Sequence, residues 1–185
     1  MTNLKKIISG VAMVFFMTGL MSTPASAALR DTSTQKSSTR DVVEFSENVT
    51  PGTIVVNTNQ RRLYYVIGDG TAISYPVAVP KRGKEWSGVT TISDKRANPD
   101  WTPPEDVRAD HPDLPEVIPG GAANNPMGTH AMLLERGEVA IHGTTSKMRS
   151  SIGSAASYGC IRMRNEDVAD LYSRVSVGAT VIMQP

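Results

Sequence analysis

The sequence is poor in cysteine, in excess charge of either sign and in long apolar runs. Its 185 residues include one cysteine, Cys160, so no intramolecular disulfide forms and a disulfide-stapled scaffold is excluded. The formal net charge is +1, whereas nucleic-acid binders normally carry a basic excess or patch, so no nucleic-acid partner is expected. After residue 27 no apolar run is long enough to span a bilayer. Gly-rich phosphate loops and Gly-x-Ser-x-Gly elbows are also missing.

The first 27 residues have the three parts of a removable export signal. Lys5 and Lys6 supply the positive start, residues 7–20 form an apolar stretch of 14, and Ala25-Ser26-Ala27 resembles a cleavage site. A membrane span needs about 20 apolar residues, so an uncleaved anchor is the less favoured alternative. Lys5 and Lys6 are the only charges in this segment. Removing it leaves 158 residues with 17 of the 19 basic side chains and all 18 acidic ones.

The remainder has the length and pattern of one folded domain. Residues 28–50 are predicted to be a disordered tether, because residues 28–48 are rich in Ser, Thr and charge, and residues 51–185 the domain. Short β-branched or alternating runs predict strands at 53–56, 63–67, 73–79, 130–134, 139–142 and 179–183. We therefore expect a mostly-β sandwich or barrel with one or two short helices.

Two segments depart from the strand pattern. Asn165 is predicted to cap a helix whose apolar face falls at i, i+3, i+4 and i+7, with Val168, Leu171, Tyr172 and Val175. Residues 93–127 hold seven of the 12 prolines and show no clear periodicity. Such a long irregular loop is either functional, as a lid or substrate wall, or a sign that an element was missed. We favour the functional interpretation.

Cys160 is the first candidate for chemistry. Gly159 lets the backbone turn sharply before it, and N–H groups in such a turn can face a developing oxyanion. Arg162 shares a face with Cys160 in an extended stretch, where its guanidinium favours a thiolate and can hold a carboxylate. Considered alone, Cys160 could equally be a small buried hydrophobic residue.

His142 strengthens the case for a reactive thiol. It ends a predicted strand 18 residues before Cys160, across a Gly- and Ser-rich loop that can fold back. An imidazole next to a thiol serves as its base or its ion-pair partner. No acidic residue lies between 139 and 165, so the carbonyl of Gly143 is expected to orient the imidazole. A purely structural histidine is the alternative.

A metal site is not expected. His111, His130 and His142 are spaced by 19 and 12 residues, which matches no compact ligand motif, and no second cysteine is available.

Several separated runs together resemble the signature of bacterial L,D-transpeptidases, the enzymes with a YkuD-type catalytic domain. The resemblance covers roughly Pro51 to Met183. The runs are Asn98-Pro99-Asp100-Trp101-Thr102-Pro103-Pro104, Asn125-Pro126-Met127-Gly128, Ile141-His142-Gly143-Thr144, Ser151-Ile152-Gly153, Ser157-Tyr158-Gly159-Cys160-Ile161-Arg162-Met163 and Asn165-Glu166-Asp167-Val168.

The resemblance implies a role for each matching residue. Cys160 would be the nucleophile, His142 its base and Gly143 the group that orients the imidazole. Gly159 and Cys160 would supply oxyanion N–H groups, and Arg162 would support the substrate side of the site. Ser157 and Tyr158 belong to the same substrate-binding run. Many members of the family carry histidine where this chain has Tyr158; a phenol there can still bind substrate or wall the pocket.

The resemblance also implies an activity. Such enzymes attack the bond between the third residue and D-Ala of a peptidoglycan tetrapeptide stem, form a thioester, and pass the acyl group to an amine. The amine belongs to another stem or to an outer-membrane protein, and no metal or cofactor is needed. We therefore expect an exported, monomeric enzyme of the periplasm or cell wall. An L,D-hydrolase using the same site and a catalytically silent wall-binding module are the alternatives.

Overall fold

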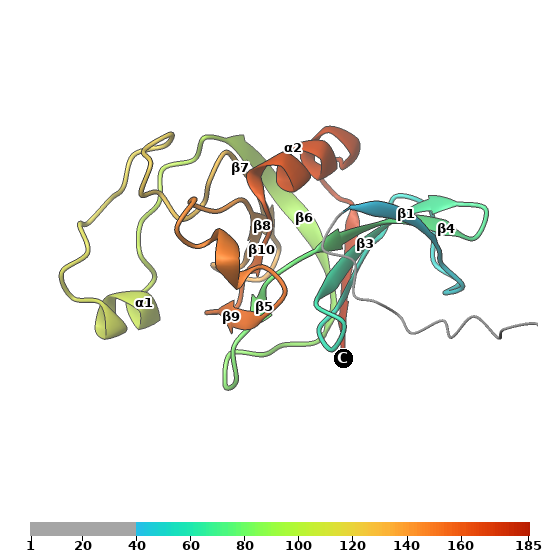
Figure 1. The fold of residues 1–185 in the computed structure, drawn as a ribbon, viewed down its shortest axis with the longest axis horizontal. Helices are drawn as coiled ribbons and strands as arrows, with labels where there is room; N and C mark the ends of the chain where they lie inside the picture. Colours follow the sequence, from blue (N-terminus) through green and yellow to red (C-terminus); the bar gives the residue numbers. More distant parts are fainter. Residues whose placement is uncertain (1–39) are drawn as a thin grey trace, which may run out of the picture. The chain divides into compact units, whose positions relative to one another are not determined.

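The computed structural model describes residues 40–185, and this part of the chain is mostly β, as predicted (Figure 1). In this range nine strands form one mixed sheet in the order β1-β4-β3-β2-β11-β6-β7-β8-β10, and β5 pairs with β9. The strands are β1 (Asp41–Glu44), β2 (Ile54–Asn57), β3 (Arg62–Gly68), β4 (Thr71–Pro76), β5 (Val79–Pro80), β6 (Gly88–Ala97), β7 (His130–Leu134), β8 (Ala140–His142), β9 (Ala155–Ser157), β10 (Ile161–Arg162) and β11 (Thr180–Gln184). The helices are α1 (Glu105–Asp110), α2 (Asn165–Arg174) and the 3-10 turn η1 (Arg149–Ser151).

Strand β6 joins the two halves of the sheet. Its first residues pair antiparallel with β11 and its later ones with β7, and the register shifts between Ile92 and Asp94. Beyond β7 the sheet ends in β8 and β10, which pair in parallel. This end of the sheet carries the candidate catalytic residues, so its register determines how they meet.

The main core gathers side chains from both halves of the sheet and from α2. On β2, Ile54 and Val56 belong to this core, whereas Val55 points to the opposite face and joins a smaller cluster with Phe45. Both faces of β2 are thus covered, which explains its continuous β-branched sequence. The main core includes Leu63, Tyr75, Ile92, Met132, Ile141, Ile161, Met163, Val168 and Leu171, all buried.

Helix α2 buries the apolar face that the sequence predicts. Val168, Leu171 and Val175 are buried, and each contributes about 1.5–3 kcal/mol of transfer free energy. Tyr172 is partly buried and stacks against the ring of His130, with 4.7 Å between the centroids.

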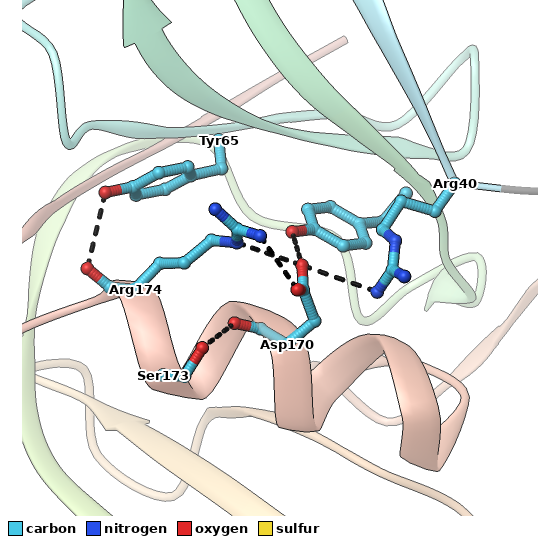
Figure 2. A network of polar contacts seen from close by, with 6 residues as sticks. Arg40, Tyr65, Asp170, Ser173 and Arg174 are labelled. Atoms are coloured by element: carbon cyan, nitrogen blue, oxygen red, sulfur yellow. Dashed lines mark hydrogen bonds and ion pairs between the residues drawn. The ribbon is translucent and has the colours of Figure 1, made fainter.

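A polar network fastens the C-terminal half of α2 to the sheet (Figure 2). Asp170 accepts a hydrogen bond from the buried Tyr75 hydroxyl at 2.6 Å and two from Arg174 at 2.9 and 3.0 Å. Arg40, just before β1, lies 3.4 Å from the same carboxylate. These cationic and phenolic partners hold the pKa of Asp170 below its usual range, with Arg174 the largest cause. The network therefore joins α2, β4 and the start of β1.

The predicted tether is wrong for its last residues. Strand β1 pairs antiparallel with β4, and Phe45 is buried with its N–H bonded to Gly70 at 2.7 Å. The segment has few apolar residues, but an existing sheet edge supplies backbone partners that need no local hydrophobic pattern. Residues 28–39 of the tether and the predicted export signal, residues 1–27, lie outside the described residues.

Part of the Pro-rich segment also forms regular structure. Strand β6 runs into it as far as Ala97, and α1 lies within it, set apart from the sheet in Figure 1. Both were missed because they carry little apolar signal: Ile92 is the buried residue of β6, and α1 buries none. The rest of residues 98–127 is irregular, as predicted. Among residues 40–185, no helix combines the length and apolar character needed to cross a bilayer.

Candidate active site

Cys160 lies directly before β10, on the wall of a cavity of about 610 Å³. Three parts of the chain line this cavity: residues 101–127, residues 138–148 and residues 157–162. The Pro-rich segment thus forms one wall, and the ends of β8 and β10 form the other. A second cavity of about 670 Å³, lined by residues 48–53 and 174–182 together with Tyr65, contains none of the candidate residues.

The parallel pairing of β8 with β10 brings Cys160 and His142 into the same cavity. Arg162 is the register partner of His142, and Ile161 that of Ile141. The N–H of Met163 donates to the His142 carbonyl at 2.8 Å, which extends the ladder past the site. Residues 143–159 return the chain to this edge, as the sequence predicted, though they also contain η1 and β9. His142 is therefore held by backbone pairing, and Cys160 lies one residue before the paired segment.

Burial keeps both His142 and Cys160 uncharged at neutral pH. Burial, with a smaller effect of Arg162, lowers the pKa of His142 to about 4. Burial raises the pKa of the Cys160 thiol, against the opposing effects of the Ala140 N–H and of Arg162. At neutral pH the cavity is therefore lined by a thiol and a neutral imidazole rather than by a preformed ion pair.

Contacts from the neighbouring strand hold the Cys160 sulfur. The Ala140 N–H donates to Sγ at 3.4 Å, and the thiol points at the Glu138 carbonyl at 3.7 Å. Gly143 acts on His142 in the direction expected of an orienting carbonyl: its backbone and that of Pro126 raise the imidazole pKa. Neither forms a hydrogen bond of normal geometry with Nδ1, which is buried.

Ser157 and Arg162 make structural contacts within the site. The buried Ser157 hydroxyl donates to the Cys160 carbonyl at 2.5 Å and receives the Gly159 N–H at 3.4 Å, so it shapes the turn around the nucleophile. Arg162 is 8% exposed and donates from Nη1 to Ser151 at 2.8 Å, while its buried Nε has no hydrogen-bond partner among residues 40–185. Its charge lies close enough to affect both Cys160 and His142.

Tyr158 connects the site to the opposite wall. Its hydroxyl donates to Asp110, the last residue of α1, at 2.5 Å. The Lys81 ammonium lies 3.5 Å from the Tyr158 ring centroid and 3.5 Å from the same carboxylate. Lys84 pairs with Asp106 on the same helix. Sequence reasoning missed this set, because 48 residues separate Asp110 from Tyr158 and no local pattern relates them.

Asn165 has a different role from the predicted one. Helix α2 has no side-chain cap, and Arg164 occupies the N-cap position. The Asn165 Oδ1 instead accepts the N–H groups of Thr144 at 3.0 Å and Thr129 at 3.3 Å. A Cβ added at Gly143 would lie 2.2 Å from this oxygen, so glycine is required next to His142. The carboxamide thus fixes the segment that follows the candidate base.

The three histidines do not form a metal centre. Within residues 40–185 no group of three or more His, Cys, Asp or Glu side chains is placed to hold a metal ion. His111 lies on the irregular cavity wall, and His130 packs against Tyr172.

Comparison with known proteins gives consistent results for most of the described chain. The family profile of the L,D-transpeptidase catalytic domain (YkuD) matches residues 51–183. The probable L,D-transpeptidase YcfS of Escherichia coli is 41% identical over 138 residues, which are 69% of this chain and 42% of that protein. The chain therefore matches less than half the length of this curated relative.

Two solved structures are also similar. An L,D-transpeptidase from Mycobacterium smegmatis aligns with a TM-score of 0.57 at 21% identity, over 72% of this chain and 58% of that one. A Brucella melitensis structure described as a probable carnitine operon oxidoreductase aligns with a TM-score of 0.51 at 41% identity, over 76% and 89% of the two chains. The present chain has no Gly-rich phosphate loop of the kind used in dinucleotide binding. The extent of the profile match and the identity to YcfS show that the chain belongs to the L,D-transpeptidase (YkuD) catalytic domain family.

Proposed function

We propose that this protein is a peptidoglycan L,D-transpeptidase that uses Cys160 as its nucleophile. The observation that carries the proposal is that His142, at the end of β8, and Cys160, directly before the parallel strand β10, line one cavity in a chain of this family. The family acts in peptidoglycan metabolism. The chemical steps, the acceptor and the exported location are inferences for this chain.

The first half of the reaction acylates the enzyme. His142 takes the thiol proton as the sulfur attacks the carbonyl carbon of the third stem residue, and an oxyanion forms. When the C–N bond to D-Ala breaks, the imidazolium gives its proton to the leaving amine, and a thioester remains on Cys160. The low pKa of His142 leaves the imidazole neutral before the attack and makes the imidazolium a ready proton donor to the leaving amine, although it also makes the imidazole a weak base toward the thiol.

The second half transfers the acyl group. An acceptor amine attacks the thioester carbonyl, loses a proton to His142 and forms an amide, and the sulfur leaves and regains the proton. Arg162, buried beside Cys160 and lining the cavity, is suited to hold a substrate carboxylate. The acceptor is another stem peptide or an outer-membrane protein.

The test is incubation of the purified protein with tetrapeptide-containing muropeptides. We expect D-Ala release and amide-linked dimers, and we expect Cys160→Ala to abolish both. Full activity of Cys160→Ala would contradict the thioester mechanism. Shortened stems without dimers, even with excess acceptor amine, would identify an L,D-hydrolase. A thiol unreactive toward both stem peptides and a carbapenem would identify a silent wall-binding module.

A further inference from the structure

Trp86 contacts the backbone of the candidate nucleophile from outside the cavity. It lies between β5 and β6, and its indole Nε1–H donates to the Gly159 carbonyl at 2.8 Å. The ring is partly buried against the main core, and the Arg136 guanidinium lies 4.7 Å from its centroid. Packing against the main core therefore holds the donor in place, and Arg136 adds a cation–π contact on the ring. Trp86 is not among the residues that line the cavity, whereas Cys160 is.

The Gly159 carbonyl belongs to the same peptide unit as the Cys160 N–H. No cis peptide occurs in the described chain, and the C=O and N–H of a trans peptide point in opposite directions. A hydrogen bond that ties the carbonyl to Trp86 therefore turns the Cys160 N–H away from Trp86. Gly159 has φ +128°, a conformation that side chains other than hydrogen rarely allow, and glycine has many other conformations open to it, so an external hydrogen bond is needed to fix this peptide plane.

The next peptide unit is anchored as well. The Cys160 carbonyl accepts the Ser157 hydroxyl at 2.5 Å, so both peptides that flank the nucleophile have a fixed carbonyl. Trp86 fixes the Gly159–Cys160 peptide, whose N–H belongs to Cys160. When the Cys160 sulfur attacks a substrate carbonyl, this N–H is the nearest donor to the carbonyl oxygen.

We propose that Trp86 is a positioning residue for the oxyanion hole, because its indole N–H fixes the Gly159–Cys160 peptide with the Cys160 N–H directed at the oxyanion. This inference rests on the proposed function, since an oxyanion forms only if Cys160 attacks a carbonyl. Removal of an oxyanion donor lowers kcat by about 100- to 1,000-fold in serine hydrolases. Loss of the anchor keeps the donor but loosens its direction, so a reduction of about 10-fold is expected, within that limit.

The experiment compares two reactions of one thiol in the full-length Trp86→Phe protein, which keeps an aromatic ring but loses the N–H. Acylation by a carbapenem or a stem peptide passes through an oxyanion, whereas alkylation by iodoacetamide does not. We expect kcat for stem peptide and the carbapenem acylation rate to fall about 10-fold, with KM and the alkylation rate unchanged. Arg136→Met is the matched control: it removes the ring contact, keeps the hydrogen bond, and should leave acylation nearly at the wild-type rate.

Rescue separates positioning from packing. Trp86→His restores a ring N–H and should recover part of the acylation lost in Trp86→Phe, with thermal unfolding followed for every variant. An unchanged acylation rate in Trp86→Phe, an equal fall in acylation and alkylation, or equal acylation in the Phe and His variants would each overturn the proposal. Failure of the proposed function looks different, because the wild-type protein itself would then show no Cys160-dependent acylation.

Discussion

The two walls of the Cys160 cavity are built by different means. The catalytic wall, residues 138–142 and 157–162, consists of paired strand ends whose apolar residues Ile141 and Ile161 are fully buried. The loop wall, residues 101–127, is held by one isolated bridge, Trp101 to Ile118, by buried amide contacts and by exposed polar contacts of α1, which buries no residue.

We expect the rigid catalytic wall to serve the chemical step and the more weakly held loop wall to control the entry of substrate. A thiol and its base must keep their relative position to a fraction of an ångström, and a hydrogen-bonded ladder over a packed core provides that rigidity. A wall that admits a branched peptide and then an acceptor needs only modest stability, and exposed ion pairs supply little. We therefore expect variants of the catalytic wall to change kcat, and variants of the loop wall to change KM.

The largest effect is expected for the base. His142→Gln keeps a polar side chain of similar reach but cannot take up the thiol proton, so kcat for stem peptide should fall about 100- to 10,000-fold. Stopped-flow acylation across pH gives the second readout: the wild-type rate should decline as the pH falls through about 4, where the imidazole becomes protonated. A loss of similar size in a loop-wall variant such as His111→Gln would erase the distinction between the walls.

The free energy of unfolding should also depend on pH, because the His142 imidazole is buried and neutral. The pKa of His142 is lower in the folded chain than its unperturbed value of 6.5, so the unfolded chain binds more protons between pH 6.5 and about 4. Stability due to this group is complete above pH 6.5 and is lost as the pH falls, by about 3 kcal/mol at most. When urea unfolding is measured at several pH values, the free energy of unfolding should fall less toward acid pH in His142→Gln than in the wild type. Equal falls in the two proteins would mean that the imidazole is not buried in its neutral form.

That Cys160 and His142 would meet in one site was predictable from sequence because its information is local. His142 ends a β-branched run, Cys160 follows a glycine, and both occur in runs that the family shares. The parts that support them are not local: 73 residues separate Trp86 from Gly159, and 36 separate Asn165 from Thr129. Asn165 was predicted to cap α2 because asparagine favours that position, but tertiary contacts outweighed the local preference.

The strands also divide into those that local sequence predicts and those that depend on distant contacts. Strands rich in buried β-branched residues, such as β2 and β11, were predicted within a residue or two. Strand β1 was predicted to be part of a tether, and the second half of β6, from residue 93, part of a loop, because each depends on a neighbouring strand rather than on its own apolar content. The irregular course of the Pro-rich segment was predicted, whereas its position against Cys160 required the three-dimensional structure.

Two asparagines, Asn165, which is half-buried, and Asn125, which is buried, test the two walls with the same substitution. Next to the catalytic wall, Asn165→Ala removes the acceptor for the Thr129 and Thr144 N–H groups and should cost about 1–3 kcal/mol, with a lower kcat. On the loop wall, Asn125→Ala removes a donor to the carbonyls of Pro99, Ile118 and Pro119, and should cost about the same but raise KM. Asn165→Asp keeps the acceptor and is the control. Identical kinetic effects in the two alanine variants would contradict the division.

The smallest effect is expected where the two walls meet, at Tyr158. Tyr158→Phe removes the hydrogen bond to Asp110 and keeps the ring beneath Lys81, so α1 loses one of its exposed polar contacts and nothing buried. We expect kcat to stay unchanged, KM to rise by less than about threefold, and hydrogen exchange of the α1 amides to become faster. Asp110→Asn weakens the same contact from the other side and should match it. Salt should reduce the difference from wild type, because ions screen the neighbouring Lys81 and Lys84 pairs. A fall in kcat comparable with that of His142→Gln would instead place the phenol among the groups that touch the reacting atoms.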